Sequence, residues 1–82
     1  MTRSEIFEHF NSIFRDVFDD DSLVITDSTT AADIDEWDSL TQIMLLVAME
    51  DLFHLQFVVD EISGLKNVGE MADLISRKLG GE

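Results

Sequence analysis

Residues 36–53 of the chain read EWDSLTQIMLLVAMEDLF. Within this stretch Asp38, a residue type that caps helix N-termini, stands directly before a long apolar segment. We therefore predict a helix over residues 39–53. Its apolar residues do not fall on one face, because side chains such as Met44 and Met49 fill the positions between the expected stripe residues. A helix that is apolar nearly all round lies in a core or presents a binding face, and in so small a protein we expect both.

The N-terminal residues predict an earlier helix over residues 3–18. Thr2 followed by Glu5 has the form of a capping box. The carboxylates of residues 19–21 end the helix, because they oppose the negative end of its dipole. Apolar and aromatic residues recur at helical spacing and form a wide stripe, which we interpret as core: Ile6, Phe7, Phe10, Ile13, Phe14, Val17 and Phe18.

The C-terminal part predicts one short and one long helix. Residues 55–59 alternate weakly, but a lone strand has no partner here, so we expect an extended loop. Asp60 is then expected to cap a single turn over about residues 60–64. Asn67 starts a last helix over residues 68–79, which Gly80 and Gly81 stop.

Together these segments predict an all-α fold over residues 1–82, a single domain. It is a small bundle of three main helices plus one short helix, with a long loop between the first two. That loop, residues 19–37, shows no sustained periodicity, and its length suggests a functional loop. Its expected anchors to the core are Leu23, Val24, Ile25, Ile34 and Trp37.

Composition excludes several classes of function. The net charge is −13, and between residues 16 and 65 there are thirteen acids and no Lys or Arg, which argues against nucleic acid as a partner. A hydrophobic content of 45% is too high for a disordered acidic tail. The chain has no cysteine, hence no disulfide, zinc-thiolate site or thiol nucleophile of its own. The longest apolar run, residues 43–49, is too short to insert in a membrane, and no signal peptide precedes it, which favours a cytoplasmic protein.

Ser39 is the residue best placed for chemistry. It stands in the first turn of the predicted second helix, where unpaired backbone N–H groups and the positive end of the dipole suit a phosphate ester. Serine is also a common first-turn residue with no further role. Local physics alone leaves both interpretations open.

The surrounding blocks decide between them, because their order and spacing over nearly the whole chain resemble those of stand-alone acyl carrier proteins. In such proteins a serine at the start of the second helix is the attachment site. The matching blocks here are Asp-Ser-Leu at 38–40, an apolar helix ending in MEDLF at 49–53, DEI at 60–62 and NVGEMADLI at 67–75.

The resemblance implies that Ser39 receives 4′-phosphopantetheine from coenzyme A through a Mg²⁺-dependent transferase. Acyl groups would then be carried as thioesters on the thiol of this arm. The chain has no cysteine, so the arm would supply the only thiol. It also implies that Asp38 and Leu40 contact the transferase, a holo-acyl-carrier-protein synthase or other phosphopantetheinyl transferase. Leu40 and Leu65 would border the route of the arm.

By the same resemblance, acyl-loading, condensing and acyl-transfer enzymes read the second helix and the short third helix. We expect the chain to act as a monomer without an active site of its own. The residues expected on the partner face are Thr41, Met44, Val47, Ala48, Glu50, Asp51, Asp60 and Glu61.

Two departures from the family pattern leave the pathway open. Fatty-acid carriers usually show acids along the exposed side of the second helix, where this chain has Thr41, Met44 and Val47. Trp37, two residues before the serine, looks more like carriers of specialised pathways. A fatty-acid-like, polyketide or other specialised pathway is therefore expected. A peptidyl carrier typically has Gly-Gly where this chain has Glu36-Trp37, and a D-alanyl carrier is harder to exclude.

Two functions of other classes are also considered. An unmodified acidic interaction module would bind a basic partner and work unchanged without Ser39. A calcium-binding protein is disfavoured, because the acids of residues 27–38 only loosely resemble a calcium loop and Ala32 stands where the sharp turn needs glycine. His9 and His54 lack metal-ligand spacing, so we expect no metal site and no catalytic residue.

The charge pattern predicts that added salt or Mg²⁺ raises the melting temperature. Carboxylates without a nearby base repel one another, and the Debye length falls from about 30 Å at 0.01 M salt to about 8 Å at 0.15 M. Thermal unfolding followed by circular dichroism over this range measures the effect. A flat or falling melting temperature would contradict a concentrated acidic surface.

Overall fold

The computed structural model describes residues 1–80, and these residues form helices and loops with no strand. This confirms the all-α fold. The elements are α1 (Arg3–Phe18), the short 3-10 helix η1 (Ala31–Asp33), α2 (Ser39–Phe53), α3 (Val59–Ile62) and α4 (Val68–Lys78). The second helix therefore has the predicted bounds, and so does the first.

The start and end of α1 follow from local hydrogen bonds. The Thr2 hydroxyl accepts from the Glu5 N–H at 3.2 Å, and the Thr2 N–H donates to the Glu5 carboxylate at 2.8 Å, so the predicted capping box is confirmed. The helix ends where Asp19 takes a left-handed conformation with φ of 51°.

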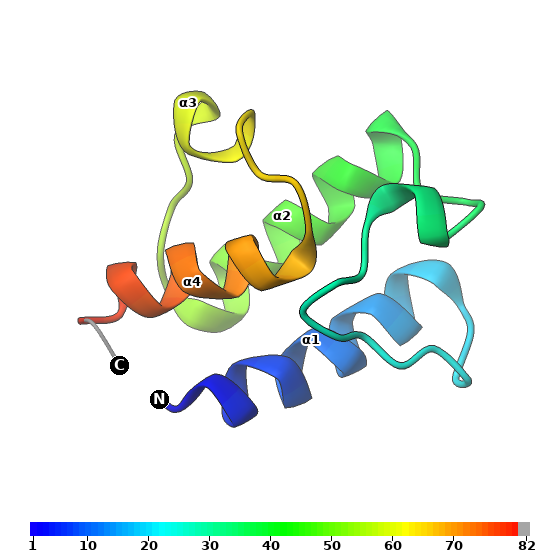
Figure 1. Ribbon diagram of the computed structural model, residues 1–82, viewed down its shortest axis with the longest axis horizontal. Helices are drawn as coiled ribbons and strands as arrows, with labels where there is room; N and C mark the ends of the chain where they lie inside the picture. The colour runs from blue at the N-terminus through cyan, green and yellow to red at the C-terminus, as the bar shows by residue number, and fades with distance from the viewer. Residues whose placement is uncertain (81–82) are drawn as a thin grey trace.

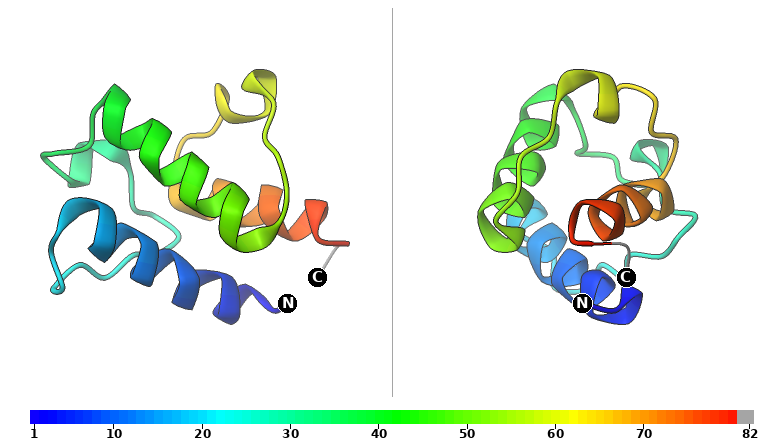
Figure 2. Two further views of the ribbon diagram at one scale, coloured as in Figure 1. Left: turned by 180° about the vertical axis from the view of Figure 1, so that it is seen from behind. Right: turned by 90° about the vertical axis from the view of Figure 1, so that its left-hand side faces the viewer.

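The three long helices enclose one apolar core. Helices α2 and α4 run in the same direction and α1 runs against both, while α3 lies in the connection that returns from the end of α2 to the start of α4 (Figure 1, Figure 2). The aromatic stripe of α1 belongs to this core, as predicted. The fully buried side chains with the greatest volume are Phe10, Phe14, Ile6, Leu45, Met49 and Ile75.

The long loop between α1 and α2 is held by the N-terminus of α4. The Val68 N–H donates to the Thr29 carbonyl at 2.8 Å, and the Gly69 N–H donates to the Asp27 carbonyl at 2.9 Å. Two of the N–H groups that a helix start leaves unpaired are thus satisfied by loop carbonyls. Asn67 is the N-cap of α4, and its side-chain oxygen accepts from the Glu70 N–H in the same first turn at 2.9 Å.

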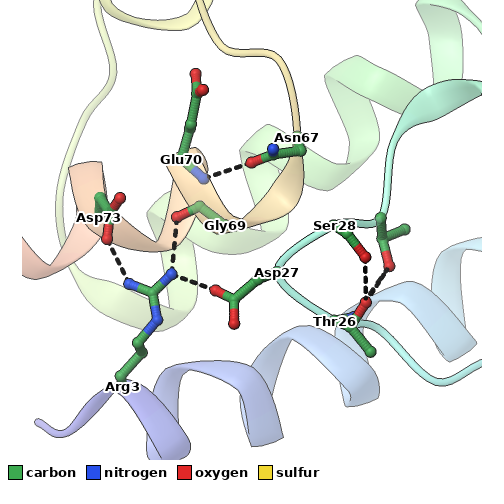
Figure 3. A network of polar contacts seen from close by, with 9 residues as sticks. Arg3, Thr26, Asp27, Ser28, Asn67, Gly69, Glu70 and Asp73 are labelled. Atoms are coloured by element: carbon green, nitrogen blue, oxygen red, sulfur yellow. Dashed lines mark hydrogen bonds and ion pairs between the residues drawn. The ribbon is translucent and has the colours of Figure 1, made fainter.

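Arg3 joins the same loop to both α1 and α4. Its guanidinium donates to the carboxylates of Asp27 and Asp73 and, at 3.2 Å, to the Gly69 carbonyl (Figure 3). These ion pairs are largely solvent-exposed, so they orient the loop more than they stabilise the fold.

The loop anchors agree with expectation except at Val24. Ile25 is buried, and Leu23 and Trp37 pack against the core. Val24 is instead 68% exposed, so its prediction as an anchor was wrong. The reason is that the Ile25 N–H is bonded to the Asn11 side-chain oxygen at 2.7 Å, which fixes Ile25 inward, and neighbouring side chains of an extended segment point to opposite sides.

The last two predicted helices need small corrections. Helix α3 begins at Val59 with Val58 as its N-cap, so Asp60 lies inside the first turn and does not cap it. The helix starts one residue earlier than predicted because the Glu61 carboxylate accepts from the Val58 N–H at 3.0 Å. Helix α4 ends at Lys78, and Gly80 follows with φ of 111°. Gly81 lies outside the described residues.

The close approach of loop and helix predicts that Gly69→Ala destabilises the fold. An ideal Cβ at this position would lie 2.7 Å from the Asp27 backbone oxygen. We expect a loss of about 1–3 kcal/mol in urea unfolding, although alanine is the better helix former. Gly64→Ala is the matched control, because a Cβ there meets nothing within 4 Å. Equal stability of the two variants would contradict the proposed contact.

Candidate functional site

Ser39 is the first residue of α2, and its side chain is exposed. The helix start is fixed immediately before it. The Asp38 carboxylate accepts from the Thr41 N–H at 2.9 Å, and the Asp38 N–H donates to the Thr41 hydroxyl at 2.8 Å. The predicted cap at Asp38 is therefore confirmed. The serine hydroxyl is presented to solvent by a helix terminus with a defined conformation.

The environment of Asp38 favours its ionised form. The hydrogen bond from the Thr41 N–H is the main cause that lowers the pKa of this carboxyl below its usual value of 3.8, and the Thr41 hydroxyl adds to the effect. A negative charge at this place also interacts favourably with the positive end of the α2 dipole.

Trp37 anchors the chain two residues before Ser39. Its ring packs edge-on against Phe14 with centroids 5.3 Å apart and lies beside Phe18 at 6.2 Å. Its indole N–H donates to the Gln42 side-chain oxygen at 2.6 Å. The interpretation of Trp37 as a loop anchor is thereby confirmed. The segment that precedes Ser39 is tied to α1 and to the first turns of α2.

A cavity of about 130 Å³ lies beside this anchor. Its walls come from α2, α4, the loop around Thr30 and the segment that follows α3. Leu65 lines it, whereas Leu40 stands outside its lining and is 66% exposed. The lining side chains are Thr30, Ala31, Trp37, Gln42, Leu45, Leu46, Met49, Ile62, Leu65, Lys66, Asn67, Val68 and Met71.

The outer side of α2 carries an exposed apolar stripe, defined by Leu40, Ile43, Met44 and Val47. These residues are spaced i, i+3, i+4 and i+7, so they share one helix face. Ile43 and Val47 are both more than half exposed. The stripe begins directly after Ser39.

Only part of the expected partner face is freely exposed. Asp51 and Asp60 are exposed like Met44 and Val47. Thr41 and Ala48 are half-buried.

The other two acids make internal bonds. The Glu50 carboxylate accepts from the Phe57 N–H at 2.9 Å. Glu61 pairs with the Lys78 ammonium at 2.8 Å, and this contact is the main cause that lowers the pKa of its carboxyl. Neither acid is as free for a partner as the sequence suggests.

The remaining titratable candidates do not converge on Ser39. His9 packs edge-on against Phe53 at 5.6 Å, and His54 is the exposed C-cap of α2. Within residues 1–80, no group of three or more His, Cys, Asp or Glu side chains is arranged to hold a metal ion. No helix in the described part of the chain is both long and apolar enough to span a membrane.

Comparison with known proteins gives one clear relationship. No family model and no curated protein matches the chain. Among solved structures, the holo acyl carrier protein from Geobacter metallireducens, determined in solution by NMR, is 48% identical, with a TM-score of 0.84. The match covers 89% of this chain and 84% of that one. The chain belongs to the acyl carrier protein family.

Acyl carrier proteins as a class are carriers rather than enzymes. Two features of this family member were missed from sequence. Ile43 belongs to the exposed stripe, and its spacing from Leu40 and Val47 could have revealed it. Gln42 lines the cavity, and nothing local marks it, since its partner is the indole of Trp37.

The Asp38 cap predicts a defined pH dependence. A carboxyl whose pKa is lowered in the folded state stabilises the fold above its unfolded pKa, and this contribution is lost as the pH falls through the folded value. Between about pH 7 and about pH 2.5, the wild type should therefore lose more stability than Asp38→Asn, which still caps the helix but does not titrate. Urea unfolding at each pH measures both. Identical losses would mean that Asp38 is not held in its ionised form.

Proposed function

We propose that this acyl carrier protein carries acyl groups on a 4′-phosphopantetheine arm attached to the Ser39 hydroxyl. The observation that carries the proposal is the exposed Ser39 at the N-terminus of α2, in a chain 48% identical to an acyl carrier protein described as holo. The name holo implies a bound prosthetic group in that relative.

The residues around Ser39 suit a phosphodiester. The hydroxyl is exposed, so a transferase can reach it. The unpaired N–H groups and dipole of a helix start favour a negative phosphate next to it. The Asp38 carboxylate opposes a second negative charge, but its bond to the Thr41 N–H turns it toward the helix backbone. Asp38 and Leu40 then flank the hydroxyl as contacts for the transferase.

The attachment step uses Ser39 as a nucleophile. Its oxygen attacks the phosphorus that bears the pantetheine unit in coenzyme A, and the bond from that phosphorus to the bridging oxygen of the pyrophosphate breaks. Adenosine 3′,5′-bisphosphate leaves, and the hydroxyl proton passes to a base of the Mg²⁺-dependent transferase. When bound, the group supplies the thiol on which acyl chains form thioesters, and the chain has no cysteine to do so.

The cavity beside α2 supports acyl cargo. Leu45, Leu46 and Met49 of α2 face Ile62 and Leu65 across it. An apolar cavity of about 150 Å³ admits a molecule such as benzene, so comparable room suits a short acyl segment. Leu65, in this wall, and Leu40, one residue after Ser39, are proposed to border the route of the arm.

We further propose that partner enzymes dock on the apolar stripe of α2 and the acids near it. Acyl-loading, condensing and acyl-transfer enzymes would contact Met44, Val47, Asp51 and Asp60 most directly. Thr41, Ala48, Glu50 and Glu61 would contribute at the edge, where they are half-buried. Charged rims steer association, whereas the apolar stripe adds contact area. This arrangement favours a specialised, fatty-acid-like or polyketide pathway.

Ser39→Ala should abolish attachment. Apo protein incubated with coenzyme A, Mg²⁺ and a broad-specificity phosphopantetheinyl transferase should gain one phosphopantetheinyl group by intact-mass spectrometry. The variant should gain none while keeping the helical circular-dichroism spectrum of the wild type, because its side chain makes no buried contact.

Ser4→Ala is the matched control, since Ser4 is also an exposed serine in the first turn of a helix. It should be modified like the wild type. Modification of Ser39→Ala, or no modification of the wild type, would rule out the attachment site. In the second case the unmodified acidic interaction module becomes the better explanation.

A further inference from the structure

Two carboxamide side chains line the cavity together with its apolar residues. Gln42 comes from the first turns of α2, and Asn67 is the N-cap of α4. Polar groups are few in such sites, and those present usually fix the orientation of a ligand and set specificity. The state of these two amides therefore bears on which cargo the cavity accepts.

The oxygen of each carboxamide is already engaged. The indole N–H of Trp37 is a donor only, so the atom of Gln42 that lies 2.6 Å from it is the oxygen. The Asn67 oxygen accepts from the Glu70 N–H at 2.9 Å, which is likewise a donor. Both amides are thus held in one orientation by a neighbour.

The side-chain nitrogen of each carboxamide donates no hydrogen bond to the described residues. Within residues 1–80, neither the Gln42 nor the Asn67 side-chain nitrogen has a hydrogen-bond partner. Each carries two N–H groups. Gln42 and Asn67 line the cavity together with apolar residues such as Leu46, Met49 and Leu65, and Thr30 and Lys66 are its other polar lining residues.

The geometry points to a cavity that selects acyl chains bearing a carbonyl or hydroxyl oxygen over saturated chains of the same length. The two amide nitrogens are accessible to water. A saturated chain that displaces this water offers the amides no acceptor, whereas an oxygenated chain accepts from one or both. Gln42 and Asn67 are then specificity-determining residues, and Trp37 positions Gln42. This inference rests on the proposed loading of Ser39 and names the class of cargo.

The test compares two cargoes of equal length on the intact protein. A phosphopantetheinyl transferase is given hexanoyl-coenzyme A or 3-oxohexanoyl-coenzyme A, so that each acyl arm is attached to Ser39 in one step and verified by intact mass. The 3-oxohexanoyl form should melt about 4 °C or more above the hexanoyl form, as one added hydrogen bond in a domain of this size allows. The side-chain NH₂ signals of Gln42 and Asn67 should also shift in NMR spectra of the 3-oxohexanoyl form only.

Variants locate the effect. Gln42→Glu keeps an acceptor for the Trp37 indole and removes the donors, and Asn67→Asp keeps the cap of α4 and does the same. Each should abolish the difference in melting temperature or reduce it by about half. Gln56→Glu makes the same charge change at an exposed residue away from the cavity, and it should keep the full difference.

The outcomes separate this inference from the proposed function. If both cargoes load but melt alike in the wild type, or if Gln56→Glu loses the difference as fully as Gln42→Glu, cargo selection by the two amides is wrong and the carrier function stands. If no cargo is attached to Ser39, both fail together.

Discussion

Two backbone hydrogen bonds hold the structure in its functional form. They run from the first N–H groups of α4, at Val68 and Gly69, to the carbonyls of Thr29 and Asp27 in the long loop. A loop of this length loses much conformational entropy on ordering, and this one contains no glycine or proline that would assist turns. The start of α4 has backbone N–H groups that need acceptors, and the carbonyl groups of the loop are these acceptors. Each element therefore stabilises the other.

The position of Ser39 depends on this pairing. Once the loop is held at α4, its last residues approach α1, where Trp37 packs between Phe14 and Phe18. The next residue, Asp38, is the N-cap of α2. A chain of contacts from α4 through the loop to the aromatic core thus determines where the serine hydroxyl lies. Trp37 also lines the cavity, so Ser39 and the cavity are positioned by the same anchor.

Local signals predicted the starts of the three long helices, but not the start of α3. The caps at Thr2, Asp38 and Asn67 act within three residues, so the sequence was sufficient to place these starts. The start of α3 depends on an equally local bond from the Val58 N–H to the Glu61 carboxylate, but valine is not a preferred N-cap residue, so the sequence does not mark this start.

The same distinction holds for the site. Ser39 was predicted from its helix context and from the order and spacing of sequence blocks over nearly the whole chain, whereas the cavity could not be predicted in this way. Its walls come from four separate segments. The orientation of its two carboxamides depends on their hydrogen bonds with Trp37 and Glu70. Glu61 looked like a free surface acid because its partner, Lys78, is far along the chain.

The ion pairs of residues 1–80 involve acids of the long loop, α3 and α4, and none involves an acid of α2. Arg3 pairs with the loop and α4, and Lys78 pairs with α3, all away from the exposed stripe of α2. The stripe thus lies between acids with no cation beside it in the sequence from residue 16 to 65. An apolar surface with an acidic border discourages contact between two copies of the protein, since like charges repel.

Trp37 is the only tryptophan in the chain, and its ring touches three parts of the molecule at once. It contacts the aromatic core through Phe14, closes the loop before Ser39 and borders the cavity. The tryptophan fluorescence of the protein therefore comes from a single indole, whose surroundings change when the loop detaches, when the core unfolds or when a molecule occupies the cavity. The fluorescence of Trp37 can therefore report on loop detachment, core unfolding and cavity occupancy without an added label.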